Sequence, residues 1–144
     1  MQEGKISPEE LLLEGRTIQF QPIGYSMYPL FVPGRDQAVV APIRDTVPGR
    51  GDVVLYRRDG GILVLHRIWK RRQDGFYLVG DNEHQIEGPL RRDQIKGILV
   101  GIVRKGRYFS VNNLLYRAAS GLWLWLRPLR PKLARIVSIC KRKR

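Results

Sequence analysis

Alternating apolar and polar positions predict a β-rich body between residues 17 and 103. The first such segment, residues 17–21, alternates in the way that a half-buried strand does. Five further short apolar segments follow, at 38–41, 52–56, 62–68, 75–79 and 95–103. Turn signals separate them, and Asp59-Gly60-Gly61 and Gln73-Asp74-Gly75 are typical of hairpins. Short strands with close turns favour a mainly β fold, a sandwich or a barrel.

A helical pattern precedes this body. Ser7 lies before Pro8 and Glu10, and this spacing is that of a capping box with proline in the first helical turn. Gly15 ends the pattern. We therefore expect a short N-terminal helix within residues 1–16.

A longer helical pattern follows the body. Its apolar residues recur at helical spacing: Leu114, Leu115, Ala118, Leu122 and Trp125. Pro128 and Pro131 interrupt this helix. A second apolar stripe precedes the basic residues 141–144, and it consists of Leu133, Ile136, Val137 and Cys140. These patterns divide the chain into an N-terminal helix (1–16), a body (17–106) and a basic amphipathic tail (107–144).

Positive charge is concentrated in the tail. The 144 residues include 26 Lys and Arg and 13 Asp and Glu, a formal net charge of +13. Residues 1–103 contain 14 of the cations and all 13 acids, whereas residues 104–144 contain 12 cations and no acid. Such a segment seeks an anionic partner. The Trp residues and apolar stripes favour an anionic membrane surface over nucleic acid, which we do not expect as a partner. A helix packed on its own body or on a partner protein is the alternative.

Composition excludes several other classes of protein. A single cysteine, Cys140, excludes a disulfide framework and a cysteine-based zinc site, and two histidines leave little for a histidine-rich metal site. We therefore expect no metal and no cofactor. The N-terminal residues lack the cationic start and apolar run of a signal peptide, and no stretch reaches the ~18–20 apolar residues of a membrane span. These features predict a cytoplasmic protein, bound at most peripherally to the cytoplasmic face of the membrane.

Three segments carry residues suited to catalysis. In the first, Gly24-Tyr25-Ser26-Met27-Tyr28-Pro29, a serine lies between a glycine and a proline after a predicted strand. A sharp turn there would expose the hydroxyl and direct backbone N–H groups at one point, as a serine nucleophile and its oxyanion hole require. Taken alone, the segment is also typical of an ordinary turn.

The other two segments offer a base and an acid. His66 lies within an apolar strand and is a candidate general base, although a hydrogen-bonded structural histidine also fits the pattern. Residues 80–87 contain Asp81, in a Gly-Asp-Asn turn, and Glu87. A carboxylate here could orient the imidazole, as the third member of a catalytic triad does, and a plain turn is the alternative.

The order of these motifs resembles the signal peptidase I / LexA-type serine peptidase superfamily. The matching segments are Gly-x-Ser-Met-x-Pro at 24–29, Pro-Gly-Arg-Asp at 33–36, Arg-Gly-Asp-Val-Val-Leu-Tyr at 50–56, Leu-His-Arg-Ile at 65–68, Gly-Asp-Asn at 80–82 and Ile-x-Gly-x-x-Val at 95–100. Bacterial signal peptidase I and LexA-type repressors have a lysine base where this chain has His66. The chain therefore looks like the Ser-His branch, which includes archaeal, sporulation-type and endoplasmic-reticulum signal peptidases.

The resemblance implies a small, mainly β peptidase, with a coiled β-sheet or partial barrel of the LexA/signal peptidase type, and a set of site residues. Ser26 would be the nucleophile and His66 the general base, with Asp81 favoured as the acid and Glu87 as the other candidate. The neighbouring residues Gly24, Tyr25, Met27 and Pro29 would form the oxyanion hole and contact the substrate. That substrate would be a leader or signal-like peptide, bound in extended form beside edge strands.

The chain also departs from that family. Gly24 stands where signal peptidase I often has a hydroxyl residue, so the oxyanion hole would rely on backbone donors. The N-terminal segment is too short for the membrane helix of signal peptidases or for the DNA-binding domain of LexA-type repressors. A non-catalytic peptide-binding or membrane-surface module with the same fold is the alternative function.

Overall fold

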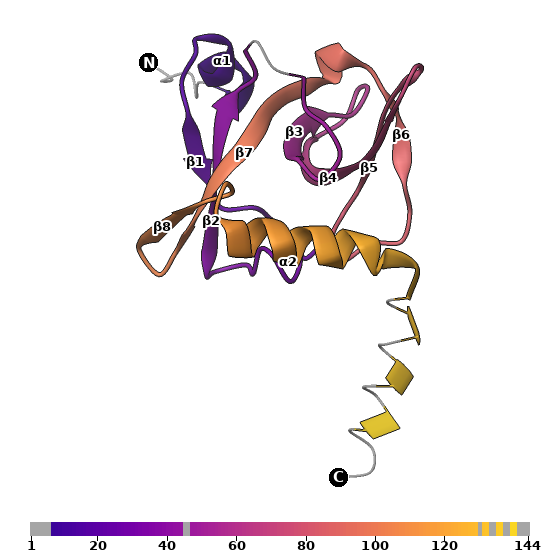
Figure 1. Ribbon diagram of the computed structural model, residues 1–144. Helices are drawn as coiled ribbons and strands as arrows, with labels where there is room; N and C mark the ends of the chain where they lie inside the picture. Colours follow the sequence, from indigo (N-terminus) through magenta and orange to yellow (C-terminus); the bar gives the residue numbers. More distant parts are fainter. Residues whose placement is uncertain (1–6, 45–46, 130, 133–134, 137–138, 141–144) are drawn as a thin grey trace.

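The structure, a computed structural model, describes residues 7–44, 47–129, 131–132, 135–136 and 139–140. Within them, eight strands form one antiparallel sheet in the order β1-β2-β7-β3-β4-β5-β6, with β8 paired to β7 (Figure 1). The strands are β1 (Ile18–Phe20), β2 (Asp36–Pro42), β3 (Val53–Arg57), β4 (Leu63–Arg72), β5 (Gly75–Val79), β6 (Glu87–Leu90), β7 (Ile95–Arg104) and β8 (Arg107–Ser110). The described sheet does not close into a barrel, and the expected mainly β fold is confirmed.

The six strands expected from alternation are present, and two more were not predicted. The expected hairpin turns join β3 to β4 and β4 to β5. β6 contains glycine and proline and β8 begins with arginine, so neither alternates clearly. β8 nevertheless pairs with β7 and extends the sheet to Ser110, beyond the boundary expected at residue 106.

The short helix α1 (Pro8–Leu13) forms as its capping pattern predicts. The Ser7 hydroxyl accepts a hydrogen bond from the Glu10 amide, and the Glu10 carboxylate accepts one from the Ser7 amide, both at 3.2 Å. Leu12 is buried among sheet residues and joins the helix to the core.

The central strand β3 is buried on both faces and separates two hydrophobic clusters. Val53 packs in the first cluster, with α1 and the loop before β2, and Val54 packs in the second, with β4 and β5. Successive residues of a strand point to opposite faces. Since β4 pairs with β3 in the register Val54↔His66 and Val53↔Arg67, His66 faces the second cluster and Arg67 the first.

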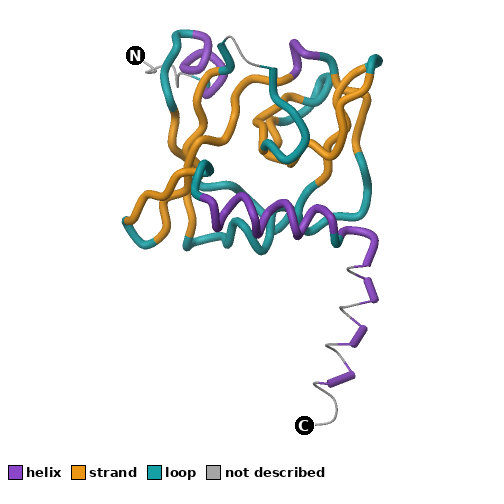
Figure 2. Tube along the Cα trace, viewed as in Figure 1, coloured by secondary structure: helices purple, strands orange, loops and turns teal. Residues whose placement is uncertain are grey.

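The helix α2 (Leu114–Trp125) lies along one side of the sheet (Figures 1 and 2). Asn113 begins it, because its side chain accepts a hydrogen bond from the Leu115 amide at 2.9 Å. As expected, the helix ends before Pro128, and a single 3-10 turn follows it (Arg127–Leu129).

α2 contacts the body with the face opposite to its apolar stripe. Leu124 is 5% exposed, Tyr116 packs against the first cluster, and the Trp123 indole donates to the backbone carbonyl of Asp81 at 2.8 Å. The large residues of the stripe point outward instead: Leu114, Leu115, Leu122 and Trp125. Packing on the body is thus achieved by the two aromatic residues with polar atoms and by one leucine.

The second predicted stripe is only partly described. Ile136 and Cys140 are exposed, whereas Leu133, Val137 and residues 141–144 lie outside the described residues. Among the helices that the structure describes, none has the length and apolar character needed to cross a membrane.

Candidate active site

Ser26 lies in the loop that joins β1 to β2. Gly24 has a φ of +84°, a left-handed conformation that glycine adopts readily, so the expected sharp turn is present. Ser26 is half-buried and Tyr25 is exposed, which places the serine near the surface. Met27 is 3% exposed and packs in the first cluster, so its side chain anchors the loop and is not open to a substrate.

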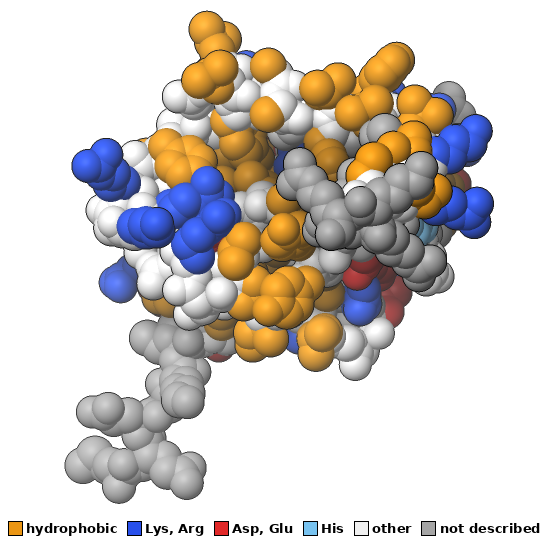
Figure 3. Space-filling model, turned by 90° about the horizontal axis from the view of Figure 1, so that it is seen from below, with side chains coloured by type: hydrophobic (Ala, Val, Ile, Leu, Met, Phe, Trp, Pro, Cys, Tyr) orange, Lys and Arg blue, Asp and Glu red, His pale blue; other side chains and the backbone are white. Residues whose placement is uncertain are grey.

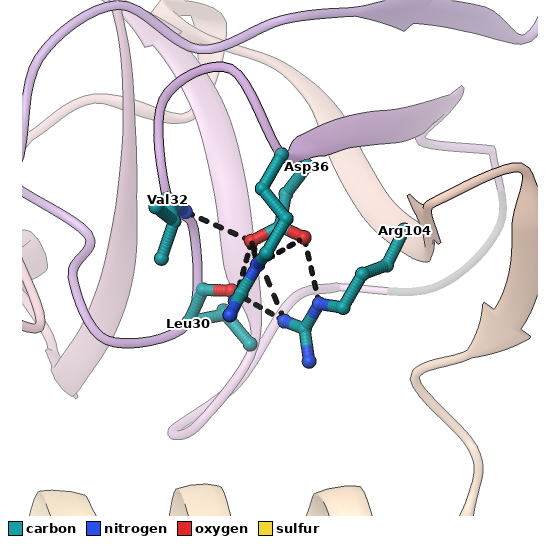
Figure 4. Close-up of polar contacts among 5 residues, drawn as sticks. Leu30, Val32, Asp36 and Arg104 are labelled. Atoms are coloured by element: carbon teal, nitrogen blue, oxygen red, sulfur yellow. Dashed lines mark hydrogen bonds and ion pairs between the residues drawn. The ribbon is translucent and has the colours of Figure 1, made fainter.

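The far end of this loop is held by a buried carboxylate, Asp36 (Figure 4). Asp36 accepts hydrogen bonds from Arg104 Nε at 2.7 Å, Arg35 Nε at 3.0 Å and the Val32 amide at 2.8 Å. Arg104 also donates to the Leu30 carbonyl at 3.1 Å. Although burial raises the pKa of Asp36, these hydrogen bonds outweigh burial and hold the pKa below its ordinary value. The ionised carboxylate therefore fastens the loop to the sheet.

The Gly80-Asp81-Asn82 turn holds the serine segment from the other side. The Asn82 amide donates to the Ser26 carbonyl at 2.8 Å, and the Asp81 amide donates to Met27 Sδ at 3.4 Å. A Cβ on Gly80 would lie 2.6 Å from the Ser26 carbonyl oxygen. The motif needs glycine at this position because the two backbones approach too closely for a side chain.

His66 is buried in β4, and one of its ring nitrogens lies against Tyr56. The Tyr56 hydroxyl is 3.1 Å from His66 Nδ1 and donates a hydrogen bond to Glu87 at 2.5 Å. Arg58 donates to the same carboxylate at 2.8 and 3.0 Å. Glu87, one of the two acids considered from the sequence, thus reaches the imidazole through Tyr56.

These contacts determine which atoms of Tyr56, Glu87 and His66 carry a proton. Burial and the hydrogen bond to Glu87 raise the pKa of Tyr56, so the hydroxyl keeps its proton and gives it to Glu87. Although burial raises the pKa of Glu87, hydrogen bonds from Arg58 and Tyr56 outweigh it and lower the pKa. The Tyr56 oxygen then accepts from Nδ1–H of His66, which leaves Nε2 with a lone pair. Burial lowers the pKa of His66 despite the opposing charges of Glu83 and Glu87, so the imidazole is neutral at pH 7.

The other ring nitrogen of His66, Nε2, is connected to the serine segment only indirectly, through Glu83 and Gly80. Nε2 is 3.7 Å from a carboxylate oxygen of Glu83. A Cβ on Gly80 would meet both the Glu83 side chain, at 3.1 Å, and the Ser26 carbonyl. The structure therefore brings the Ser26 segment, Glu83 and the imidazole together. Within the described part of the chain, the Ser26 hydroxyl and the imidazole are not hydrogen-bonded to each other.

The side chain of Asp81 pairs with Arg67 on the other face of β4. Arg67 Nε and Nη2 donate to the two carboxylate oxygens at 2.7 and 2.8 Å, and both side chains are buried. Arg67 also donates to the Gly51 carbonyl at 2.8 Å. Because both oxygens of Asp81 are engaged by Arg67, the geometry favours Glu87 as the carboxylate that orients His66.

A cavity of about 480 Å³ lies between α2 and the end of the serine loop. Pro29 and Leu30 line it on the loop side, and Tyr116 and Trp123 line it on the helix side. The Arg67–Asp81 pair also contributes to its wall. Pro29, expected to contact substrate, therefore borders a largely apolar space large enough for side chains of a peptide.

Four residues of this site were not predicted from the sequence: Tyr56, Arg58, Arg67 and Glu83. For Arg67 a signal did exist, because a guanidinium within an apolar strand needs a buried carboxylate partner. Tyr56 offered no such signal, since a tyrosine in an apolar strand is ordinary core. Glu83 lies inside the motif segment 80–87 but carries no pattern of its own.

Comparison of the chain with protein-family models, with curated proteins and with solved structures found no match. The function proposed below therefore rests on the chemistry of the site.

Proposed function

We propose that this protein is a serine endopeptidase of the signal peptidase-like type, with Ser26 as nucleophile and His66 as general base. One observation carries the proposal: Tyr56 engages Nδ1 of the buried His66 imidazole, which leaves Nε2 to act as the base, and Nε2 lies 3.7 Å from Glu83, whose side chain borders Gly80 as the Ser26 carbonyl does. A general base needs this tautomer and protonation state. The antiparallel sheet is compatible with the LexA and signal peptidase type of fold that the motif order suggests.

The proposed reaction has two stages. Ser26 Oγ bonds to the peptide carbonyl carbon while its proton passes to His66 Nε2, and the proton then goes to the leaving amine as the C–N bond breaks. Water next gives a proton to the same nitrogen and attacks the acyl-enzyme ester, and the serine is released with its proton restored. Glu87 stabilises the transient imidazolium through Tyr56, which is the role of the acid in a catalytic triad.

Backbone groups supply the oxyanion hole in this proposal. The Tyr28 amide donates to the Tyr25 carbonyl at 3.0 Å and closes a tight turn around the serine. The Ser26 amide is the proposed donor to the oxyanion, since Gly24 has no hydroxyl to offer.

The proposed substrate is a leader or signal-like peptide in extended form. β1 is an edge strand of the described sheet, and it ends at Phe20, shortly before the Ser26 loop. A peptide that added to this edge as a further strand would run toward the serine. We expect small side chains beside the cleaved bond.

A serine-directed acylating probe tests this proposal. The wild-type protein should become covalently labelled at Ser26, as measured by intact mass and peptide mapping, and Ser26→Ala should not be labelled. His66→Gln should label at least about a hundredfold more slowly, since general-base catalysis contributes ~10²–10⁴ in rate. The matched control is His84→Gln, because His84 is exposed and is not part of the site.

A non-catalytic peptide-binding module is the second candidate function. The specific observation in its favour is that the Ser26 hydroxyl and His66 are not hydrogen-bonded to each other in the described residues. This candidate predicts no labelling of a protein that is folded by circular dichroism. Labelling of Ser26 that depends on His66 would exclude it.

A further inference from the structure

The outward face of α2 is apolar and exposed. Its large residues are Leu114, Leu115, Leu122 and Trp125, with exposed fractions of 84, 81, 56 and 68%. We call these four residues the α2 outer face. Figure 3 looks onto this side of the molecule and shows hydrophobic side chains spread across it, with Lys and Arg at its margins. A soluble helix normally turns such residues inward, and α2 instead uses Trp123 and Leu124 for that purpose.

The same region carries only positive charge. Residues 104–144 contain 12 Lys and Arg and no acid. Arg117 is exposed on α2 itself, and Lys132 and Arg135 are exposed beyond it. Apolar residues flanked by cations are the composition of helices that lie in the interface of an anionic bilayer.

We propose that α2 docks in the plane of an anionic lipid membrane through its outer face. The partner that covers this face must accommodate leucine side chains and also attract positive charges. A second copy of the chain would bring two segments of 12 cations together, which repel each other. Nucleic acid would satisfy the cations and leave the leucines in water. A bilayer with anionic head groups receives the leucines and Trp125 at its surface and attracts the arginines. This inference does not depend on the proposed peptidase function, because Ser26, His66 and Glu87 are not part of the α2 outer face, although Leu115 also lines the cavity beside Pro29.

Vesicle binding by the full chain tests the inference. The probes are vesicles of phosphatidylcholine alone and of equimolar phosphatidylcholine and phosphatidylserine, with binding measured by co-sedimentation and by tryptophan emission. We expect tight binding to the anionic vesicles, weaker binding to the neutral ones, and a large loss of affinity between ~0.1 M and ~1 M salt.

Surface variants locate the contact. The double variant Leu122→Gln, Trp125→Gln should bind anionic vesicles at least about tenfold more weakly, since each side chain loses its apolar transfer. Arg117→Gln should weaken binding about fivefold, since each cation near the surface contributes ~1 kcal/mol. Leu13→Gln is the matched apolar control, because Leu13 is 85% exposed on α1, at the opposite end of the molecule (Figure 1). Arg71→Gln, in the β4–β5 hairpin, is the matched charge control.

Three results would overturn the proposal. The first is the absence of binding to anionic vesicles, or binding by the double variant at wild-type strength. The second is salt-dependent binding to DNA or RNA that the double variant retains, with no binding to vesicles. The third is self-association in analytical ultracentrifugation that the double variant abolishes, again with no binding to vesicles.

Discussion

Tyr56, on β3, connects the buried imidazole of His66 to the carboxylate of Glu87 on β6. The residue is fully buried, and its hydroxyl lies between His66 Nδ1 and Glu87. No other side chain is hydrogen-bonded to this imidazole among the described residues. The orientation of His66 therefore depends on one phenol, which acts as a positioning residue.

Removing that hydroxyl should slow acylation of Ser26. Tyr56→Phe keeps the aromatic ring and leaves Nδ1–H of His66 without a partner, which costs ~1–3 kcal/mol in a buried site. We expect acylation by the serine-directed probe to slow by about tenfold, measured as a rate constant by intact mass. The acid limb of the pH profile should also move to lower pH, because Glu87 no longer stabilises the imidazolium through a hydrogen bond. A rate and a pH profile equal to wild type would contradict this role.

The pH dependence of the wild-type rate reports the protonation of His66. Burial lowers the pKa of His66 below 6.5, with Arg58 acting in the same direction and Glu83 and Glu87 opposing. The proposed base is active when neutral, so the rate should change little between pH 8 and pH 7 and should fall as the pH is lowered further. The unfolded chain takes up this proton first, near its ordinary pKa of 6.5, so the free energy of unfolding also declines as pH falls below that value. His66→Gln should remove this part of the pH dependence of unfolding, and a rate that already falls between pH 8 and pH 7 would refute the assignment.

Sequence motifs named Ser26 and His66 as candidate catalytic residues, but they did not point to Tyr56, which lies between His66 and Glu87. The motif order singled out Asp81 and left Glu87 as the second choice. The structure pairs Asp81 with Arg67, a neighbour of His66 that faces the other way. Strand register decides which side chains share a face of the sheet, and therefore which carboxylate is linked to the imidazole. A single sequence does not specify this register for residues 80–90.

At the scale of elements, the loop between β1 and β2 is held at two points. At one point, the Asn82 amide donates a hydrogen bond to the Ser26 carbonyl. At the other, the Asp36 carboxylate accepts a hydrogen bond from the Val32 amide, and Arg104, its ion-pair partner, donates to the Leu30 carbonyl (Figure 4). Two attachments on a loop of this length restrict the serine to a narrow range of positions, as a nucleophile requires.

Loss of the Asp36 charge should loosen this loop. Asp36→Asn removes the buried acceptor of two arginines whose side chains are about one-third exposed, so we expect a loss of about 2–3 kcal/mol in the free energy of unfolding. Urea unfolding measures the loss, and labelling of Ser26 should slow in the folded variant. Asp59→Asn is the matched control, because its ion pair with Arg91 is exposed on both sides and should contribute little. Equal unfolding curves for the two variants would refute the role of Asp36.

The apolar patterns predicted six of the eight described strands and missed the two that have few or no buried residues, β6 and β8. β6 reads Glu-Gly-Pro-Leu, and only Leu90 of its residues is buried. It becomes a strand because Phe76 and Leu90 pair across the edge of the sheet, a tertiary contact that leaves no local pattern. Glu87 is the first residue of β6, so missing this strand also hid the partner of Tyr56.

At the scale of the whole molecule, α2 belongs to the body and not only to the tail. Leu124 is buried, and the Trp123 indole donates a hydrogen bond to the turn that also holds the serine segment. The apolar stripe in the sequence correctly predicted a helix but could not say which side faces inward. The inner face carries Tyr116, Trp123 and Leu124, and their tertiary contacts cannot be read from the periodicity of the sequence.

Two leucines on α2 distinguish the inner face from the outer one. Leu124→Ala should lower the free energy of unfolding by about 2–3 kcal/mol, because Leu124 is 5% exposed and its removal leaves a cavity. Leu122→Ala, at a residue that is 56% exposed, should change it little. Chemical unfolding of both variants checks the difference, and limited proteolysis at residues 111–113 should accelerate only in Leu124→Ala. The same loss in both variants would mean that α2 does not sit on the body in this orientation.

The register of β4 has a consequence for how this chain can evolve. His66 and Arg67 are consecutive, yet they serve opposite faces of the sheet. Inserting or deleting one residue within β4, upstream of this pair, would turn each side chain to the opposite face: a deletion would move the guanidinium to the position beside Tyr56, and an insertion would move the imidazole to the position beside Asp81. Descendants of this chain can therefore change the exposed residues of β4 and lengthen the turn before the strand. They are expected to keep His66 and Arg67 on the faces of the sheet that these residues occupy now.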